Sequence, residues 1–120
     1  MRKILIADDN PAIREMLRDI LEDMYEVVEA SDGEDALRKI EAERPELVLL
    51  DMRMPRLDGF GVLRSVRANA ALAGTRLVAL TAFAMQGDCE RALAAGLDGY
   101  ITKPVDIRSL RTHVGRLIAE

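Results

Sequence analysis

The chain has 120 residues, 49% of them hydrophobic and 32% charged, a length and balance typical of one globular domain with its own core. Its net charge of -4 comes from 17 basic and 21 acidic residues mixed along the chain, which argues against direct nucleic-acid binding. A single cysteine excludes an internal disulfide, and no apolar run suits a signal peptide or a membrane span, so we expect one cytoplasmic domain over residues 1–120.

The first two strands and helices are predicted from apolar runs and capping residues. The run at 3–7 predicts a strand, and Asn10 and Pro11 supply an N-cap and a first-turn proline. The helix that follows has an apolar face of Ile13, Leu17, Ile20 and Leu21. A more polar strand is predicted at 25–30. The capping-box pattern from Ser31 to Glu34 then starts a helix with Ala36, Leu37 and Ile40 on its apolar face.

The middle of the chain continues the alternation. Residues 46–50 form a nearly continuous apolar run, which predicts a strand buried on both faces. Asp58 and Gly59 precede a third helix, whose apolar positions are Phe60, Val62, Leu63 and Val66. Another apolar run predicts a strand at 76–81.

The last third of the chain adds one strand between two helices. The alanine-rich stretch 84–95 predicts a fourth helix, and Gly96 suits the position after its end. A short strand is predicted at 99–102. Asp106 can cap a fifth helix with an apolar face of Ile107, Leu110, Val114, Leu117 and Ile118.

The predicted order is therefore a strand and a helix, five times over. Right-handed crossovers through single helices build one open, doubly wound, five-stranded parallel sheet of the α/β class, with helices on both faces. The second and fifth strands are the more polar ones, so we expect them at the edges. Ligands of such sheets bind outside the carboxyl ends of the strands.

Three acids follow central strands at that edge of the predicted sheet. Asp8 and Asp9 follow the first strand, Asp51 follows the third, and Thr81 and Lys103 stand at the ends of the fourth and fifth. Clustered carboxylates either raise a pKa or bind a cation, and oxygen ligands without a cluster of His or Cys favour Mg²⁺. A carboxylate can also be the nucleophile that forms an aspartyl phosphate.

Each of these residues also has an ordinary structural interpretation. Asp8 and Asp9 could simply favour the start of a helix through its dipole. Thr81 alone suits a strand end, and Lys103 alone suits a solvated loop. Asp51 is the hardest to explain structurally, because an acid beside a buried strand is costly without a role.

The segments ADDN, LLDMRMPRLDG, ALTAFAMQGD and DGYITKPVD, in this order and spacing, resemble the receiver domain of two-component response regulators, the CheY-like family. The stretch TAFAMQGD is particularly similar to single-domain regulators of the DivK kind and to receivers of hybrid histidine kinases. The resemblance covers the whole chain. It implies the flavodoxin-like strand order 2-1-3-4-5 with five helices.

The resemblance implies a role for each acid. Asp51 resembles the phosphoacceptor, which takes a phosphoryl group from a phosphohistidine of a sensor kinase or a histidine phosphotransfer protein. Asp9 resembles the direct Mg²⁺ ligand and Asp8 the acid that holds the ion through water. Asp51 itself and the backbone carbonyl of Arg53 complete the implied metal site.

The resemblance also implies a switch. Thr81 would hydrogen-bond the phosphoryl group, Lys103 would pair with it, and the Lys103–Pro104 peptide would be cis. Tyr100 resembles an aromatic switch that follows the inward motion of Thr81. That motion would change the face made by the fourth helix, fifth strand and fifth helix, where a downstream protein binds.

Two positions are candidates for tuning the rate of hydrolysis. Phe83, two residues after Thr81, is bulky where water must approach the phosphoryl group. Arg53, two residues after Asp51, is long and cationic on the other side of that approach. We expect slow autodephosphorylation.

Two classes of function remain open. The first is a phosphorylation-controlled interaction module, monomeric or dimerising on phosphorylation, which turns over no diffusible metabolite and is not an enzyme in that sense. It could be free-standing, as the start at Met1 favours, or a receiver excised from a hybrid kinase. The second is a Mg²⁺-dependent phosphohydrolase with an aspartyl-phosphate intermediate, which usually needs an acid where this chain has Arg53.

Overall fold

The computed structural model describes residues 1–81, 90–91 and 93–119 of the chain. The elements in chain order are β1 (Lys3–Ala7), α1 (Pro11–Leu21), β2 (Glu26–Ala30), α2 (Gly33–Glu43), β3 (Leu47–Asp51), α3 (Gly59–Arg67), the 3₁₀ helix η1 (Ala70–Leu72), β4 (Arg76–Thr81), β5 (Gly99–Thr102) and α5 (Ile107–Ala119). Each strand lies within a residue or so of its predicted range. The prediction of an alternating α/β chain is confirmed.

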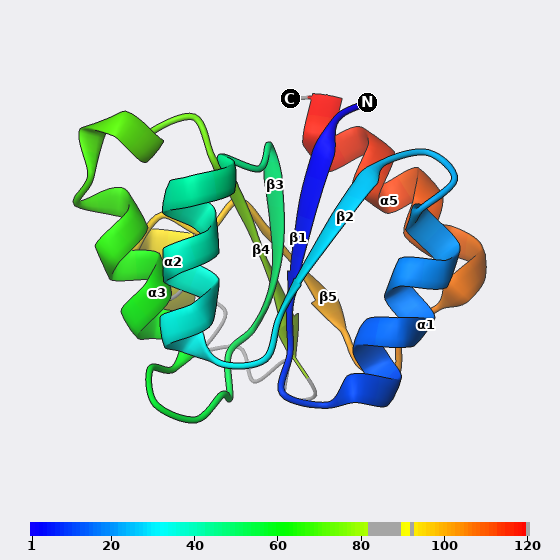
Figure 1. The fold of residues 1–120 in the computed structure, drawn as a ribbon, viewed down its shortest axis with the longest axis horizontal. Helices are drawn as coiled ribbons and strands as arrows, with labels where there is room; N and C mark the ends of the chain where they lie inside the picture. The colour runs from blue at the N-terminus through cyan, green and yellow to red at the C-terminus, as the bar shows by residue number, and fades with distance from the viewer. Residues whose placement is uncertain (82–89, 92, 120) are drawn as a thin grey trace.

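The five strands form one parallel sheet in the order β2-β1-β3-β4-β5. Helices α1 and α5 cover one face of this sheet and α2 and α3 cover the other, as Figure 1 shows. The predicted strand order, with the polar strands at the edges, is therefore confirmed. Within the described residues, no helix is long and apolar enough to cross a membrane.

The sheet separates two hydrophobic clusters. Ile4 and Ile6 of β1 pack on the side of α1 and α5, whereas Leu5 and Ala7 pack on the side of α2 and α3. Successive side chains of a strand point to opposite faces, so a central strand covered on both faces needs apolar residues at every position. This requirement explains the continuous apolar run of β1 and the complete burial of Leu47 to Leu50 in β3.

The predicted number of helices needs a correction. The described residues form four α-helices with assigned bounds, one fewer than the five predicted. The difference arises because the helix predicted at 84–95 falls largely on residues 82–89 and 92, which lie outside the described residues. Of the remainder, Glu90, Arg91, Leu93 and Ala94 are helical. Gly96 has a φ of 111°, in keeping with its predicted place after a helix.

The N-caps of the helices also test the sequence predictions. Asn10 caps α1 as predicted, and its side chain accepts a hydrogen bond from the Ala12 N–H. The capping box predicted from Ser31 to Glu34 is wrong by one residue. Asp32 is the cap of α2, and its Oδ1 accepts from the Asp35 N–H at 2.8 Å. Both Ser31 and Asp32 are good capping residues, so the local pattern alone could not choose between them.

Asp35 in the first turn of α2 is expected to stabilise the protein in a pH-dependent way. Burial raises the pKa of its carboxyl, but hydrogen bonds and charges of Lys39 and Arg38 lower that pKa more, so the net shift is downward. The group is therefore deprotonated more readily in the folded state than in the unfolded one. Its stabilisation is present above the unfolded pKa of about 3.9 and is lost as the pH falls through the lower folded pKa.

We expect Asp35→Asn to lower the free energy of unfolding at pH 7 by about 0.5–1 kcal/mol, the range of a partly exposed ion-pair and helix-dipole contribution. The difference from wild type should vanish in acid. Urea unfolding at several pH values measures this. Glu34→Gln, which changes an exposed neighbour in the same turn, is the matched control and should cost less. A difference that persists in strong acid would contradict the electrostatic explanation.

Gly33, the first residue of α2, touches the segment that follows β3. A Cβ added at Gly33 would lie 1.7 Å from the carbonyl oxygen of Leu57 and 2.5 Å from its carbonyl carbon. Backbone atoms cannot move aside as a flexible side chain can. Gly33→Ala is therefore expected to destabilise the protein by about 1–3 kcal/mol, measured by chemical unfolding. The control is Gly74→Ala, where an added Cβ meets nothing within 4 Å; equal costs at both sites would refute the prediction.

Candidate functional site

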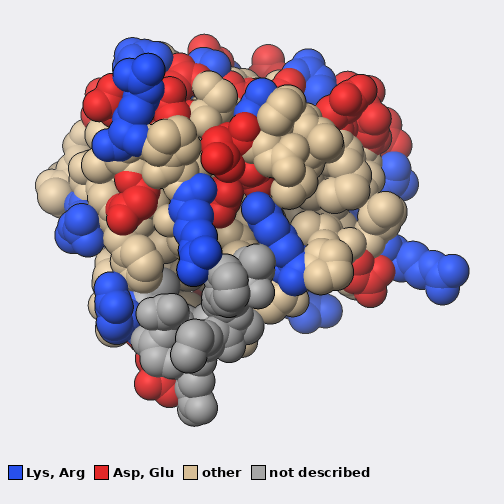
Figure 2. Space-filling view, turned by 90° about the horizontal axis from the view of Figure 1, so that it is seen from below, with Lys and Arg blue, Asp and Glu red and all other residues tan. Residues whose placement is uncertain are grey.

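The predicted site residues meet at the carboxyl edge of the sheet. Ala7 and Leu50 are partners in the parallel register of β1 and β3, so the residues that follow them, Asp8 and Asp51, stand side by side. One carboxylate oxygen from each of Asp8, Asp9 and Asp51 lies within 4.8 Å of the others. Figure 2 looks onto this end of the molecule and shows acidic side chains in a depression between basic ones.

Asp8 is completely buried, and both of its carboxylate oxygens accept hydrogen bonds. Its Oδ1 accepts a hydrogen bond from the backbone N–H of Asn10 at 2.9 Å, and its Oδ2 accepts one from Lys103 Nζ at 2.9 Å. A buried carboxylate is tolerated only when it is paired and hydrogen-bonded. Lys103, 95 residues away in the chain, supplies the opposite charge.

Asp51 is the last residue of β3 and is only 7% exposed. Its Oδ1 accepts from the Arg53 N–H at 3.0 Å, and its Oδ2 lies 3.6 Å from Lys103 Nζ. Burial raises the pKa of the Asp51 carboxyl, and the charges of Asp8 and Asp9 raise it further, against the opposing effects of the Arg53 N–H and of Lys103. Negative charge is therefore in excess here, a situation that a bound cation would relieve.

Lys103 lies between the two buried carboxylates. Burial lowers the pKa of its ammonium group, but the hydrogen bond to Asp8 and the charges of Asp51 and Asp8 outweigh burial and raise it. Its backbone N–H donates to the Thr81 carbonyl at 2.7 Å, which ties the end of β5 to the end of β4. The Lys103–Pro104 peptide is cis, as the family resemblance implies.

The remaining predicted residues lie around this cluster or outside the described residues. Thr81 is the half-buried last residue of β4, and Arg53 is exposed in the segment after β3. Phe83 lies outside the described residues, so its predicted place beside the phosphoryl group stays a prediction. The roles predicted for Thr81 and Arg53 also stay predictions.

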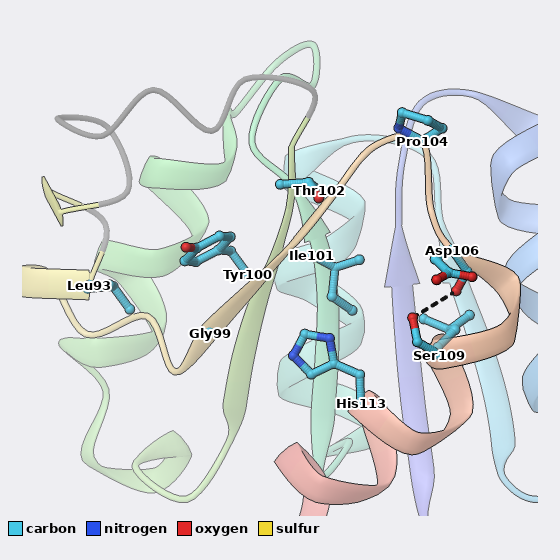
Figure 3. Close-up of a pocket in the computed structure, with 10 residues that line it drawn as sticks. Leu93, Gly99, Tyr100, Ile101, Thr102, Pro104, Asp106, Ser109 and His113 are labelled. Carbon is cyan, nitrogen blue, oxygen red and sulfur yellow. Dashed lines mark hydrogen bonds between the residues drawn. The ribbon is translucent and has the colours of Figure 1, made fainter.

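Tyr100 lies on the edge strand β5, and its side chain points to the opposite side of that strand from Ile101, which packs with α5 (Figure 3). Its side chain is among the exposed large hydrophobic ones, with 41% of the residue accessible. A pocket of about 500 Å³ lies beside it, between β5 and α5, and Figure 3 shows Tyr100, Ile101 and His113 around it. His113 is half-buried.

Sequence reasoning did not identify Arg14, which also contacts the acidic cluster. Its guanidinium Nη1 donates to the backbone carbonyl of Asp8 at 2.5 Å. The one local signal was a cation in the first turns of a helix, where the helix dipole disfavours positive charge. That signal does not say which distant group compensates for the position.

The donor set of the cluster suits a hard divalent cation. Asp8, Asp9 and Asp51 offer only carboxylate oxygens, which Mg²⁺ and Ca²⁺ prefer and which soft metals do not. The complete burial of Asp8 and the raised pKa of Asp51 both indicate that one lysine does not balance the local charge. These residues therefore fit a Mg²⁺ ion.

Comparison with known proteins decides the family. Residues 4–115 match the family model of the response regulator receiver domain. The chain belongs to the response regulator receiver domain family. Receiver domains are the phosphoryl-accepting modules of two-component signalling. The family match confirms the resemblance stated from the sequence.

Three relatives illustrate the range of proteins that contain similar receiver domains. The chain is 38% identical over 118 residues to the probable transcriptional regulator ycf27 of Cyanophora paradoxa, covering 98% of this chain and 48% of that protein. It is 31% identical to the polar-differentiation response regulator DivK of Brucella anthropi, covering 95% and 97%. The receiver domain of sensor histidine kinase PA1611 from Pseudomonas aeruginosa, with magnesium in its active-site cleft, superposes with a TM-score of 0.89 at 35% identity, covering 99% and 98%.

The extent of these matches differs between the relatives. This receiver domain spans about half the length of ycf27 and of the Bacillus subtilis regulator PhoP, whereas it spans nearly all of DivK. Receiver domains of this sequence class therefore occur both within longer proteins and nearly by themselves.

Proposed function

We propose that this receiver domain accepts a phosphoryl group on Asp51 from a phosphohistidine of a sensor kinase or a histidine phosphotransfer protein. The observation that carries the proposal is the convergence of Asp8, Asp9 and Asp51 within 4.8 Å, with Lys103 Nζ 2.9 Å from Asp8 and 3.6 Å from Asp51. In the same proposal, residues 1–120 form one domain.

Each residue of the site has a part in this chemistry. An Asp51 carboxylate oxygen forms the new bond to phosphorus, and the bond from phosphorus to the histidine nitrogen breaks, with its electron pair passing to the imidazole. Asp8, Asp9, Asp51 and the Arg53 carbonyl would hold Mg²⁺, which supplies positive charge against the phosphoryl oxygens. Lys103 adds a second cation, and the Thr81 hydroxyl donates a hydrogen bond.

The same residues explain how phosphorylation would act as a switch. A phosphoryl group adds charge and acceptor oxygens at Asp51, and Thr81 and Lys103 would be drawn toward it. Thr81 is in register with Thr102 on β5, two residues after Tyr100, so movement at the end of β4 can reach the face formed by β5, α5 and the helical residues before β5. A downstream protein would bind that face, and the shift in population is limited by the stabilisation gained.

Acetyl phosphate, with and without Mg²⁺, tests the proposal. We expect one acid-stable but base-labile phosphoryl group per chain, formed only with the divalent ion and located on Asp51 by peptide mass spectrometry. Rapid multiple turnover of an alcohol phosphate would instead favour a phosphohydrolase. Arg53 stands where such an enzyme usually needs an acid, so we expect no such turnover. Label on another residue would overturn the assignment.

The lifetime of the phosphoryl group depends, in our proposal, on Phe83 and Arg53. Phe83→Ala is expected to shorten that lifetime by about tenfold or more, because a small side chain leaves room for a water molecule aligned for attack on phosphorus. Loss of label after removal of the donor measures it. Arg53→Ala should act in the same direction. An unchanged lifetime in Phe83→Ala would refute this explanation of slow autodephosphorylation.

A further inference from the structure

An arginine on α1 holds the backbone of the acidic cluster. The side chain of Arg14 is only 17% exposed, and its Nε lies 3.4 Å from Glu29 Oε1 on β2. Its Nη1 donates a hydrogen bond of 2.5 Å to the carbonyl oxygen of Asp8. The guanidinium therefore joins the edge strand β2 to the segment between β1 and α1.

The place of Arg14 in its helix is unfavourable without these contacts. Its N–H bonds the Asn10 carbonyl, so it lies one turn into α1, near the positive end of the helix dipole. It also gives up much of its hydration. Glu29 supplies the compensating charge and fixes the orientation of the Arg14 guanidinium group. The other carboxylate oxygen of Glu29 accepts a hydrogen bond from Arg18 Nη1 at 2.5 Å.

The contact with Arg14 completes the fixation of Asp8. The Asp8 N–H donates to the Ala30 carbonyl at 3.1 Å, and its two carboxylate oxygens accept from Asn10 and Lys103. With the carbonyl bound to Arg14, each polar atom of Asp8 has a partner. That carbonyl belongs to the planar peptide that leads into Asp9, so its hydrogen bond sets the orientation of the Asp9 backbone.

Asp9 depends on this backbone for its direction. Among residues 1–81, 90–91 and 93–119, no hydrogen bond or ion pair holds the exposed Asp9 carboxylate. We propose that Arg14 is a positioning residue for the divalent-cation site. It fixes the Asp8–Asp9 peptide and thereby directs the Asp9 carboxylate toward the ion. The inference rests on the proposed function, in which these acids bind Mg²⁺.

A purely electrostatic role for Arg14 predicts the opposite result. A guanidinium beside an acidic cluster repels an incoming cation, so its removal should strengthen Mg²⁺ binding if charge alone matters. Removal of a positioning residue should weaken it, because loss of a group that orients metal ligands typically costs 10–100-fold in affinity. The sign of the change therefore separates the two explanations.

The test is a calorimetric titration of the metal-free protein with Mg²⁺. Arg14→Met is expected to raise the Kd by about tenfold or more. Arg14→Lys keeps the charge but loses the fork that reaches the Asp8 carbonyl and Glu29 together, so it should also bind more weakly. Arg18→Met, which removes the other arginine partner of Glu29 on the same helix, is the matched control and should bind as wild type. The amide NMR shifts of Asp9 and Asn10 should move in the Arg14 variants before any metal is added.

Thermal unfolding without metal shows whether each variant is folded. If Arg14→Met does not fold, Arg14→Lys decides the question. Wild-type or tighter Mg²⁺ binding by the folded Arg14 variants would overturn the inference. Asp9→Asn distinguishes a failure of the inference about Arg14 from a failure of the proposed function. If Asp9→Asn binds Mg²⁺ as wild type does, the cation site itself is misassigned. If it loses binding while the Arg14 variants keep it, only the role of Arg14 is wrong.

Discussion

Asp51→Asn is expected to lose phosphorylation by acetyl phosphate by more than about 10³-fold, because a neutral amide cannot replace a carboxylate as the nucleophile. Intact-protein mass spectrometry after donor treatment measures the loss. Asp51 is buried in front of Lys103, and asparagine has nearly the same shape, so the fold should be kept. A functional defect in this variant can therefore be assigned to chemistry.

The stability of the same variant gives an independent check. Burial and the charges of Asp8 and Asp9 raise the pKa of Asp51, so its ionised form is disfavoured in the metal-free protein. Asp51→Asn removes that charge and should raise the free energy of unfolding at pH 7 in the presence of a chelator. Asp23→Asn, at an exposed ion pair with Arg111, is a carboxylate control that should leave phosphorylation unchanged. Wild-type labelling of Asp51→Asn would exclude Asp51 as the acceptor.

Lys103→Met is expected to destabilise the metal-free protein and to impair phosphoryl transfer. Its removal leaves the fully buried Asp8 and the nearly buried Asp51 without their shared cation. Removing one partner of a buried ion pair typically destabilises a protein by several kcal/mol. Because Lys103 is still partly exposed, we expect a loss near the lower end, on the order of 3 kcal/mol. The rate of labelling should fall by about 10²-fold, as for loss of one group that stabilises transition-state charge.

Magnesium should partly rescue the stability of this variant. The ion replaces the missing positive charge, so Mg²⁺ should raise the unfolding midpoint of Lys103→Met more than that of wild type. Lys3→Met is the matched control, since Lys3 Nζ also lies 2.9 Å from a carboxylate, that of Glu43, but in an exposed pair. It should cost clearly less than Lys103→Met, because an exposed ion pair contributes little to stability. Equal costs at Lys3 and Lys103 would contradict the importance of burial.

Much of the fold could be predicted from local patterns. The strands at 3–7, 76–81 and 99–102 have the predicted bounds. For the central strands at 3–7 and 76–81 the reason is that a strand covered on both faces must be apolar along most of its length. The strand order was available from the polarity of the edge strands together with the family resemblance. The first residue of α2 could not be predicted, because Ser31 and Asp32 are both good N-cap residues.

The membership of the site was also predictable, but its geometry was not. An acid after an apolar run marks the carboxyl end of a buried strand, and this pattern is enough to identify Asp8, Asp9 and Asp51 in the sequence. Which atoms meet depends on the register of β1 against β3 and on the path of the chain after β5, which brings the Lys103 Nζ to the carboxylates of Asp8 and Asp51. Neither the register nor this path produces a repeating pattern in the sequence, so neither could be predicted from it.

Arg14 shows most clearly what only the tertiary structure decided. In the sequence it is one of two arginines on an amphipathic helix, and its position near the helix start is unfavourable in isolation. Its partners are a carbonyl six residues earlier and a carboxylate on an edge strand. The burial of residues can be predicted from the apolar and polar pattern within each helix or strand, because each residue there faces either the core or the solvent. Contacts between side chain and backbone depend on how the elements are placed against each other, and that placement is fixed only when the whole sheet has formed.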